Sequence, residues 1–134
     1  MENIALIAHD KLKKDLVDFI IERKEWIDGV NLLATGRTAE YIEPHIPNVK
    51  HLSQGRYGGY KELTNLIKEG KIDIVIFLRD FKVKYHHNDL QELLDACDEY
   101  NVPVATNPAS AEMLILGHFQ IQSIKRNLKK SQIL

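Results

Sequence analysis

Short apolar runs alternate with segments of helical periodicity, and this alternation constrains the possible folds more than any other feature of the sequence. The run at 4–8 (IALIA) is continuously apolar, as is typical of a strand covered on both faces. Further candidate strands lie at 30–34, 72–78, 102–105 and, as a short fifth, 49–52. Helical patterns occupy the intervals: one begins near Asp10, and the others lie around 38–42, 60–69, 89–100 and 110–116. The sequence therefore predicts an α/β fold with a doubly wound, mostly parallel five-stranded sheet and helices on both faces.

The length of the chain fits one hydrophobic core. Its 134 residues are too few for two ordinary domains, so we expect a single domain over 1–134. From about 118 to 134 we expect a C-terminal extension. The last part, 125–134, is basic, polar and without a clear pattern, which fits either a frayed end or a segment that contacts a neighbouring subunit.

The charge balance and the single cysteine narrow the classes of function. With 18 basic and 19 acidic residues the formal net charge is −1, which gives no global positive field of the kind that binds nucleic acid polymers, so we expect no such partner. Cys97 has no disulfide partner in the chain, and its place on an apolar helical face indicates core packing. No signal peptide pattern and no apolar run long enough to span a bilayer are present, so we expect a cytoplasmic protein without membrane contact.

Polar segments follow the predicted strands. They include 9–13 (HDKLK), 35–38 (TGRT) and 53–60 (SQGRYGGY). In an open parallel sheet, ligands bind beyond the carboxyl ends of the strands, so these segments are expected to converge. Glycines and hydroxyl side chains ahead of a helix expose backbone N–H groups, and the helix dipole adds partial positive charge there. The pattern predicts a phosphate site at this edge of the sheet, with Lys13 adding a full charge.

Six short motifs in series carry a family resemblance. In chain order they are IAHDK at 7–11, ATGxT at 34–38, GxxGG at 55–59, IFLRD at 76–80, HxxD at 86–89 and VATN at 104–107. At these intervals the chain resembles the methylglyoxal synthase family from about residue 3 to 115. The resemblance implies a doubly wound α/β domain, assembled as a hexamer, that converts dihydroxyacetone phosphate to methylglyoxal and inorganic phosphate. The same domain type occurs in regulatory modules that bind nucleotides or related phosphorylated ligands.

The resemblance assigns roles to individual residues. The family's phosphate contacts fall on Lys13, Thr35, Thr38 and Gly55, with Gln54 where the family has serine, and the glycines of the implied ligand site are Gly36, Gly58 and Gly59. The partner of the substrate carbonyl falls on His9 or His86, and the supporting acids are Asp10, Asp80 and Asp89. Because the loop after Asp80 is one residue shorter than in the family, His87 is the alternative match to the family histidine.

One position departs from the family in its chemistry. The catalytic base of the family is an aspartate directly after the paired glycines, and this chain has Tyr60 there. A tyrosine with a pKa near 10 holds little phenolate at neutral pH, whereas a well-placed base contributes about 10²–10⁴-fold to the rate. We therefore expect the lyase reaction to be impaired.

The other departures from the family add cationic or aromatic side chains around the predicted phosphate site. Arg37 stands where a small hydroxyl is usual, Arg56 stands where proline is usual, and Tyr57 and Tyr60 flank the paired glycines. Arginine on phosphate and tyrosine on a base suit a nucleotide better than a triose phosphate. The plainer alternative is that Tyr57 fills a hydrophobic slot and that both arginines are solvated.

Three hypotheses of function follow. The first is a methylglyoxal synthase-like protein that binds a phosphorylated, nucleotide-like ligand as a sensor, regulator or sequestering protein. The second is an active methylglyoxal synthase in which water or another carboxylate replaces the lost base. The third is a different lyase or isomerase of a sugar phosphate with His86 as general acid. No cofactor is expected, and no metal, because the histidines at 9, 86 and 87 lack the partners and spacing of a zinc site.

Overall fold

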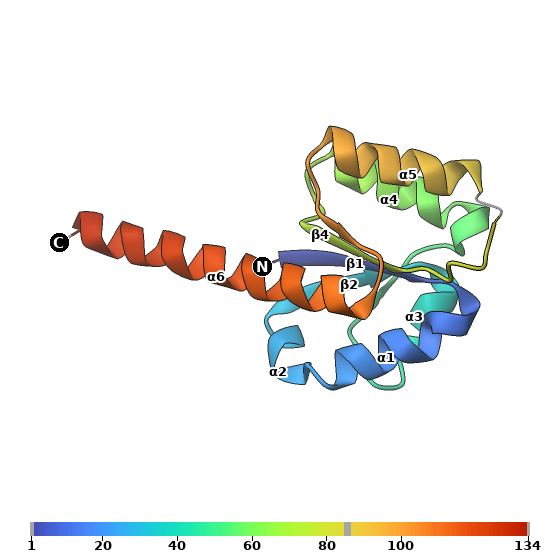
Figure 1. Cartoon of the computed structure of the whole chain (residues 1–134), viewed down its shortest axis with the longest axis horizontal. Helices are drawn as coiled ribbons and strands as arrows, with labels where there is room; N and C mark the ends of the chain where they lie inside the picture. The colour runs from blue at the N-terminus through green and yellow to red at the C-terminus, as the bar shows by residue number, and fades with distance from the viewer. Residues whose placement is uncertain (1, 85–86, 134) are drawn as a thin grey trace.

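The computed structural model describes residues 2–84 and 87–133. Its centre is a five-stranded, all-parallel sheet with the strand order β3-β2-β1-β4-β5 (Figure 1). The strands are β1 (Glu2–Ala8), β2 (Val30–Ala34), β3 (Lys50–His51), β4 (Ile74–Leu78) and β5 (Val104–Ala105). This confirms the predicted fold class, and the predicted strand at 30–34 has the observed bounds.

Helices cover both faces of the sheet (Figure 1). One layer contains α1 (Lys13–Ile21), preceded by the 3-10 turn η1 (Asp10–Leu12), together with α2 (Lys24–Ile27), α3 (Gly36–Ile42) and the start of α6 (Pro108–Ile133). The other layer contains α4 (Gly59–Lys68), preceded by the 3-10 turn η2 (Gly55–Tyr57), and α5 (Asn88–Glu99). None of the helices described in 2–84 and 87–133 is both long and apolar enough to cross a bilayer.

The central strands supply the core of both layers. Along β1, Ile4 and Leu6 pack into the layer of α1, α3 and α6, whereas Ala5 and Ile7 pack into the layer of α4 and α5. All four side chains are buried. A strand with helices on both faces needs apolar residues at every position, and this explains the continuous apolar runs of the sequence.

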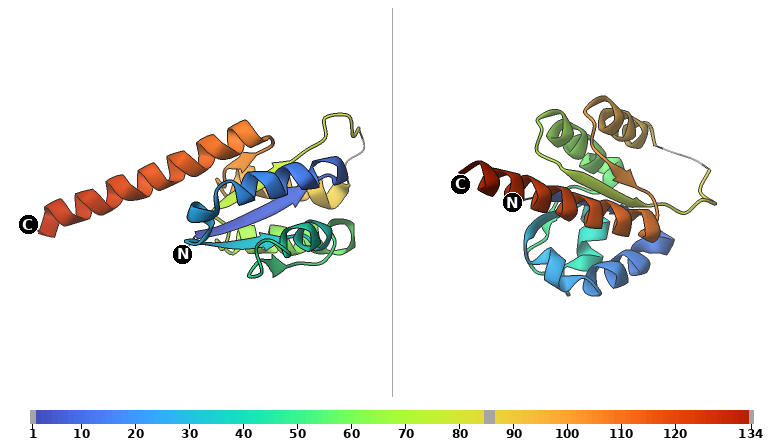
Figure 2. Two further views of the ribbon diagram at one scale, coloured as in Figure 1. Left: turned by 90° about the horizontal axis from the view of Figure 1, so that it is seen from below. Right: turned by 60° about the vertical axis from the view of Figure 1, so that its left-hand side comes forward.

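The C-terminal helix is the main correction to the prediction. The sequence pattern indicated a helix around 110–116, but α6 extends from Pro108 to Ile133 and runs past the edge of the domain (Figure 2). Only its first part packs on the sheet, through Ala111 and Ile115. Beyond residue 120 the apolar side chains Ile121, Ile124 and Leu128 are exposed and stand among basic residues, so no pattern of buried positions continues the helix there. The short helix α2 was also not predicted.

Two polar contacts hold the first half of α6 on the domain. The Arg23 guanidinium lies 3.9 Å from the Phe19 ring centroid, and its Nη2 lies 3.1 Å from the Glu112 carboxylate, which joins α1 to α6. On β1, a Glu2 carboxylate oxygen lies 3.1 Å from His118 Nε2. The helix is thus attached to a strand and to another helix.

Candidate functional site

A cavity of ≈ 570 Å³ lies at the carboxyl ends of β1, β2 and β4, the edge of the sheet where the polar segments converge. It is open to solvent, and both polar and apolar side chains line it. The lining residues are Ala8, His9, Asp10, Lys11, Lys13, Thr35, Arg37, Gln54, Gly55, Arg56, Tyr57, Tyr60, Asp80, Val83, His87 and Leu90.

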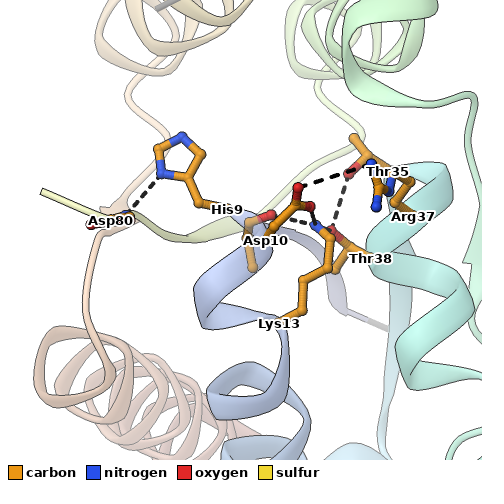
Figure 3. A network of polar contacts seen from close by, with 8 residues as sticks. His9, Asp10, Lys13, Thr35, Arg37, Thr38 and Asp80 are labelled. Atoms are coloured by element: carbon orange, nitrogen blue, oxygen red, sulfur yellow. Dashed lines mark hydrogen bonds and ion pairs between the residues drawn. The ribbon is translucent and has the colours of Figure 1, made fainter. Parts of the chain in front are cut away.

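Lys13 is the buried charge of this cavity (Figure 3). Its ammonium donates to the Ala8 carbonyl at 2.5 Å and to the Thr38 hydroxyl at 3.2 Å, and it lies 3.7 Å from the Asp10 carboxylate. Burial lowers the pKa of Lys13, an effect that the Asp10 carboxylate opposes. These contacts fix the ammonium between the ends of β1 and α3 without any ligand.

The start of α3 is joined to the same network. The Thr35 hydroxyl lies 3.4 Å from that of Thr38, and both side chains are buried. The backbone N–H of Gly36 donates to the Ser53 carbonyl at 3.0 Å. The Gly36 amide is therefore already hydrogen-bonded to the loop that contains Ser53. Thr35 lines the cavity, and Thr38 lies behind Lys13.

Arg37 lies at the rim of the cavity, where its Nη1 is 3.9 Å from the Asp10 carboxylate. Its side chain is largely exposed, so this pair is solvated and weak. Arg56 lines the cavity from η2, and Lys11 from η1. The rim thus carries cations from three separate elements.

His9 is oriented by the loop after β4. The backbone N–H of Asp80 donates to His9 Nδ1 at 2.8 Å (Figure 3). The imidazole also meets the Phe77 ring edge-on, with 5.1 Å between the ring centroids. Because Nδ1 accepts this bond, the neutral imidazole carries its proton on Nε2. Asp80 itself lines the cavity.

The loop from Ser53 to α4 is held by backbone bonds and by one carboxylate. Gly58 has φ = 114°, a conformation that favours glycine, and this turns the chain into α4. The N–H groups of Tyr57 and Gly59 both donate to the Gln54 carbonyl, and Ser53 bonds the Glu62 carboxylate through its N–H and its hydroxyl. Glu62 therefore anchors the loop and does not line the cavity.

The Tyr60 ring lies against this loop. A Cβ atom placed on Gly55 would lie 2.6 Å from Cε1 and 2.8 Å from the hydroxyl oxygen of Tyr60, so only glycine allows the ring its position. Burial raises the pKa of the Tyr60 phenol. The positive charge of Arg56 opposes this rise in pKa, and the negative charge of Asp10 adds to it. At neutral pH the cavity therefore presents a protonated phenol beside Gly55.

The start of α5 forms another wall of the cavity. His87 is the N-cap of this helix, accepts a bond from the Asp89 backbone N–H at 3.2 Å through Nδ1, and lies with its ring centroid 6.4 Å from that of Tyr60. The Asp89 carboxylate lies 3.8 Å from His87 and 4.0 Å from the Lys61 ammonium. His86, the predicted family histidine and general acid, lies outside the described residues.

The structure brings most of the predicted site residues to one cavity. Those that line it are His9, Asp10, Lys13, Thr35, Arg37, Gln54, Gly55, Arg56, Tyr57, Tyr60 and Asp80, whereas Gly36, Thr38, Gly58, Gly59 and Asp89 do not line it. Lys11 also lines the cavity, although the sequence analysis gave it no role of its own; its position beside Asp10 was a usable signal. Val83 and Leu90 form an apolar part of the wall, which nothing in the sequence pattern marked.

Three comparisons with known proteins point to one family. The family model "MGS-like domain" matches residues 15–106. Methylglyoxal synthase of Clostridium botulinum (strain Alaska E43 / Type E3) is 42% identical over 114 residues, 84% of this chain and 96% of the relative, and that of Clostridioides difficile (strain 630) is 39% identical over 132 residues, 97% and 96%. The crystal structure of methylglyoxal synthase from Elizabethkingia anophelis NUHP1 superposes with a TM-score of 0.78 at 34% identity, covering 85% of this chain and 76% of that one.

Proposed function

The chain belongs to the methylglyoxal synthase family, and from this premise we propose that its cavity binds a phosphorylated, nucleotide-like ligand while the lyase reaction is impaired. The protein would then act as a sensor, regulator or sequestering protein. The observation that carries the proposal is Tyr60, which holds a protonated phenol beside Gly55 at the position where the family resemblance implies a catalytic aspartate.

The impairment follows from proton chemistry. The family reaction begins with removal of a carbon-bound proton, which requires a base that is unprotonated at working pH. Burial raises the pKa of Tyr60 above that of ordinary tyrosine, so the phenolate fraction at neutral pH is even smaller than in water. Glu62 does not replace the base, because its carboxylate is bonded to Ser53.

The ligand class follows from charge and shape. Lys11, Arg37 and Arg56 line the cavity together with the buried Lys13, and guanidinium groups bind phosphate oxygens in pairs. Beside them the Tyr57 side chain is 78% exposed, so its ring is accessible for stacking. Cations next to an open aromatic face suit the phosphate and the base of one ligand.

A thermal-shift panel tests the binding. Nucleotides are expected to raise the melting temperature more than inorganic phosphate does at equal concentration, because a ligand stabilises in proportion to its affinity. Arg37→Ala with Arg56→Ala should abolish most of the nucleotide shift. The matched control, Lys24→Ala with Lys68→Ala, removes two exposed cations outside the cavity and should leave the shift unchanged. Equal shifts for phosphate and nucleotides would reject a nucleotide-like ligand.

An active methylglyoxal synthase is the second candidate. Two observations favour it: the Asp10 and Asp80 carboxylates line the same cavity, and the relatives named methylglyoxal synthase are 39–44% identical to this chain. Formation of methylglyoxal from dihydroxyacetone phosphate by the purified wild-type protein distinguishes the candidates. A rate that falls in Asp10→Asn would establish the synthase with a substitute carboxylate and would exclude the impaired protein.

The proposal extends to the assembly and to the compartment. We infer a homo-oligomer in the cytoplasm, with the hexamer of the family as the expected size. Light scattering of the purified protein gives the mass of the assembly, to be compared with multiples of the 15.4 kDa chain.

A further inference from the structure

The second half of α6 extends beyond the domain (Figures 1 and 2). All residues from 124 to 131 are exposed, and none of them belongs to the hydrophobic core of the described part of the chain. Isolated helices shorter than about 12–15 residues are marginal in water, and most helical stability in proteins comes from packing of one face. A projecting segment of this kind is stabilised when another surface covers it.

This projecting segment has an apolar face. Ile121, Ile124 and Leu128 are 53%, 49% and 59% exposed, and their spacing of three and four residues aligns them along one side of the helix. We refer to these three residues as the apolar stripe. Met113, 76% exposed, continues the same side toward the domain.

The same segment is strongly basic. From 118 to 134 the sequence contains Lys125, Arg126, Lys129 and Lys130 and no acidic residue. At 100° per residue, Lys125 and Lys129 border the apolar stripe, whereas Arg126 and Lys130 point to the opposite side. A surface that covers the stripe would therefore need negative charge beside an apolar patch.

The domain has such a surface at the C-terminal end of α5. A hollow of ≈ 480 Å³ is lined by Cys97, Asp98, Asn101, Val102, Pro103 and Val104. Helix α5 carries five acidic residues and no Lys or Arg. Asp95 and Asp98 are exposed one turn apart, with Asp98 at the hollow itself. The hollow therefore combines apolar side chains, Val102, Pro103 and Val104, with polar ones and has an acidic border.

The hollow and the projecting helix are at the same end of the molecule. Val104 begins β5, and His118 of α6 contacts Glu2, which begins β1. In a parallel sheet the strand starts share one edge, opposite to the edge of the cavity. The helix projects away from α5 (Figure 1), and no residue of α6 is among those that line the hollow of its own chain.

We propose that the apolar stripe of α6 docks on the α5 hollow of a second copy of this chain, in a reciprocal contact. Lys125 and Lys129 are about 6.0 Å apart along the helix axis and Asp95 and Asp98 about 4.5 Å, so both lysines can pair with both aspartates at once. Because each copy offers a helix and a hollow at one end, a two-fold axis satisfies both contacts. The contact does not depend on what the cavity binds.

Charge exchange between the two surfaces tests the contact. The wild type is expected to have at least twice the chain mass of 15.4 kDa by size-exclusion chromatography with light scattering. Two variants, Lys125→Glu with Lys129→Glu and Asp95→Lys with Asp98→Lys, should each lose at least half of the wild-type mass. An equimolar mixture of the two should regain the wild-type mass, because the mixed pair restores opposite charges at both contacts. The recovery also shows that both variants are folded.

The matched control changes the same charge on the opposite side of the helix. Arg126→Glu with Lys130→Glu should keep the wild-type mass, since these residues do not border the stripe. The proposal is wrong if this control dissociates as fully as Lys125→Glu with Lys129→Glu, if the mixture stays dissociated, or if the wild type is a monomer. A monomer that sediments with phosphatidylserine and phosphatidylcholine vesicles would assign the basic helix to an anionic membrane instead.

Discussion

The two ends of the sheet differ in whether their polar groups are hydrogen-bonded and their apolar groups are buried within the chain itself. At the carboxyl ends of the strands, Lys13 is bonded to Ala8 and Thr38, and His9 is bonded to Asp80, before any ligand arrives. At the strand starts, α6 presents an apolar stripe and four cations to solvent. The difference teaches that the cavity is organised by its own chain, whereas the opposite end is complementary to something outside it.

The largest expected effect concerns the catalytic competence of the cavity end. If that end is already organised for chemistry and lacks only a base, Tyr60→Asp should raise methylglyoxal formation by about 10²-fold, equivalent to about 2.7 kcal/mol of barrier. The measurement is the rate with dihydroxyacetone phosphate, with Tyr60→Asn as the control that adds no base. Equal rates for the two variants would show that more than the base is missing.

The next effect compares a bonded lysine with a solvated one. Lys13→Met leaves the Ala8 carbonyl and the Thr38 hydroxyl without their charged donor and should lower the free energy of unfolding by about 1–3 kcal/mol. Lys130→Met, at an exposed position of α6, should change it by less than about 0.5 kcal/mol. Urea denaturation measures both. Similar losses in the two variants would contradict the difference between the ends.

A smaller effect sharpens the description of the cavity rim. Tyr57→Ala should weaken nucleotide binding by about 1 kcal/mol and leave phosphate binding nearly unchanged, because the exposed ring offers stacking and no charge. Tyr41→Ala, which removes a half-exposed tyrosine outside the cavity, is the control. Calorimetric titration with a nucleotide and with phosphate separates the two contributions. A parallel loss for both ligands would assign Tyr57 to the shape of the loop.

The smallest effect is a pH dependence. The pKa of Tyr60 is raised in the folded state, mainly by burial, so the unfolded chain releases this proton first, near pH 10. Stability from Tyr60 is therefore fully present below about pH 10 and is lost as the pH rises through the folded-state value. The difference in unfolding free energy between wild type and Tyr60→Phe should shrink over that window. A constant difference would mean that the phenol is not shielded from water.

The sequence alone predicts the fold class and predicts that the polar segments meet at one edge of the sheet, and both predictions have a physical reason. Strands covered on both faces must be apolar at every position, and polar loops at the ends of parallel strands must meet, so both features are visible in the pattern alone. The length of α6 was missed because a helix that leaves the core has no buried face to mark it. The shielding of Gly55 by Tyr60 and the internal bonds of Lys13 depend on packing between distant elements, which no local pattern encodes.

The attachment of α6 has a mechanical consequence. Glu112 and His118 connect the helix to Arg23, just beyond the C-terminal end of α1, and to Glu2, the first residue of β1. The opposite ends of those two elements carry Lys13 and His9, the latter directly after β1. The projecting helix is therefore attached at the ends of β1 and α1, which are stiff elements, rather than to a flexible loop. A force on the free end of α6 is therefore transmitted along β1 and α1 to the cavity at their other ends.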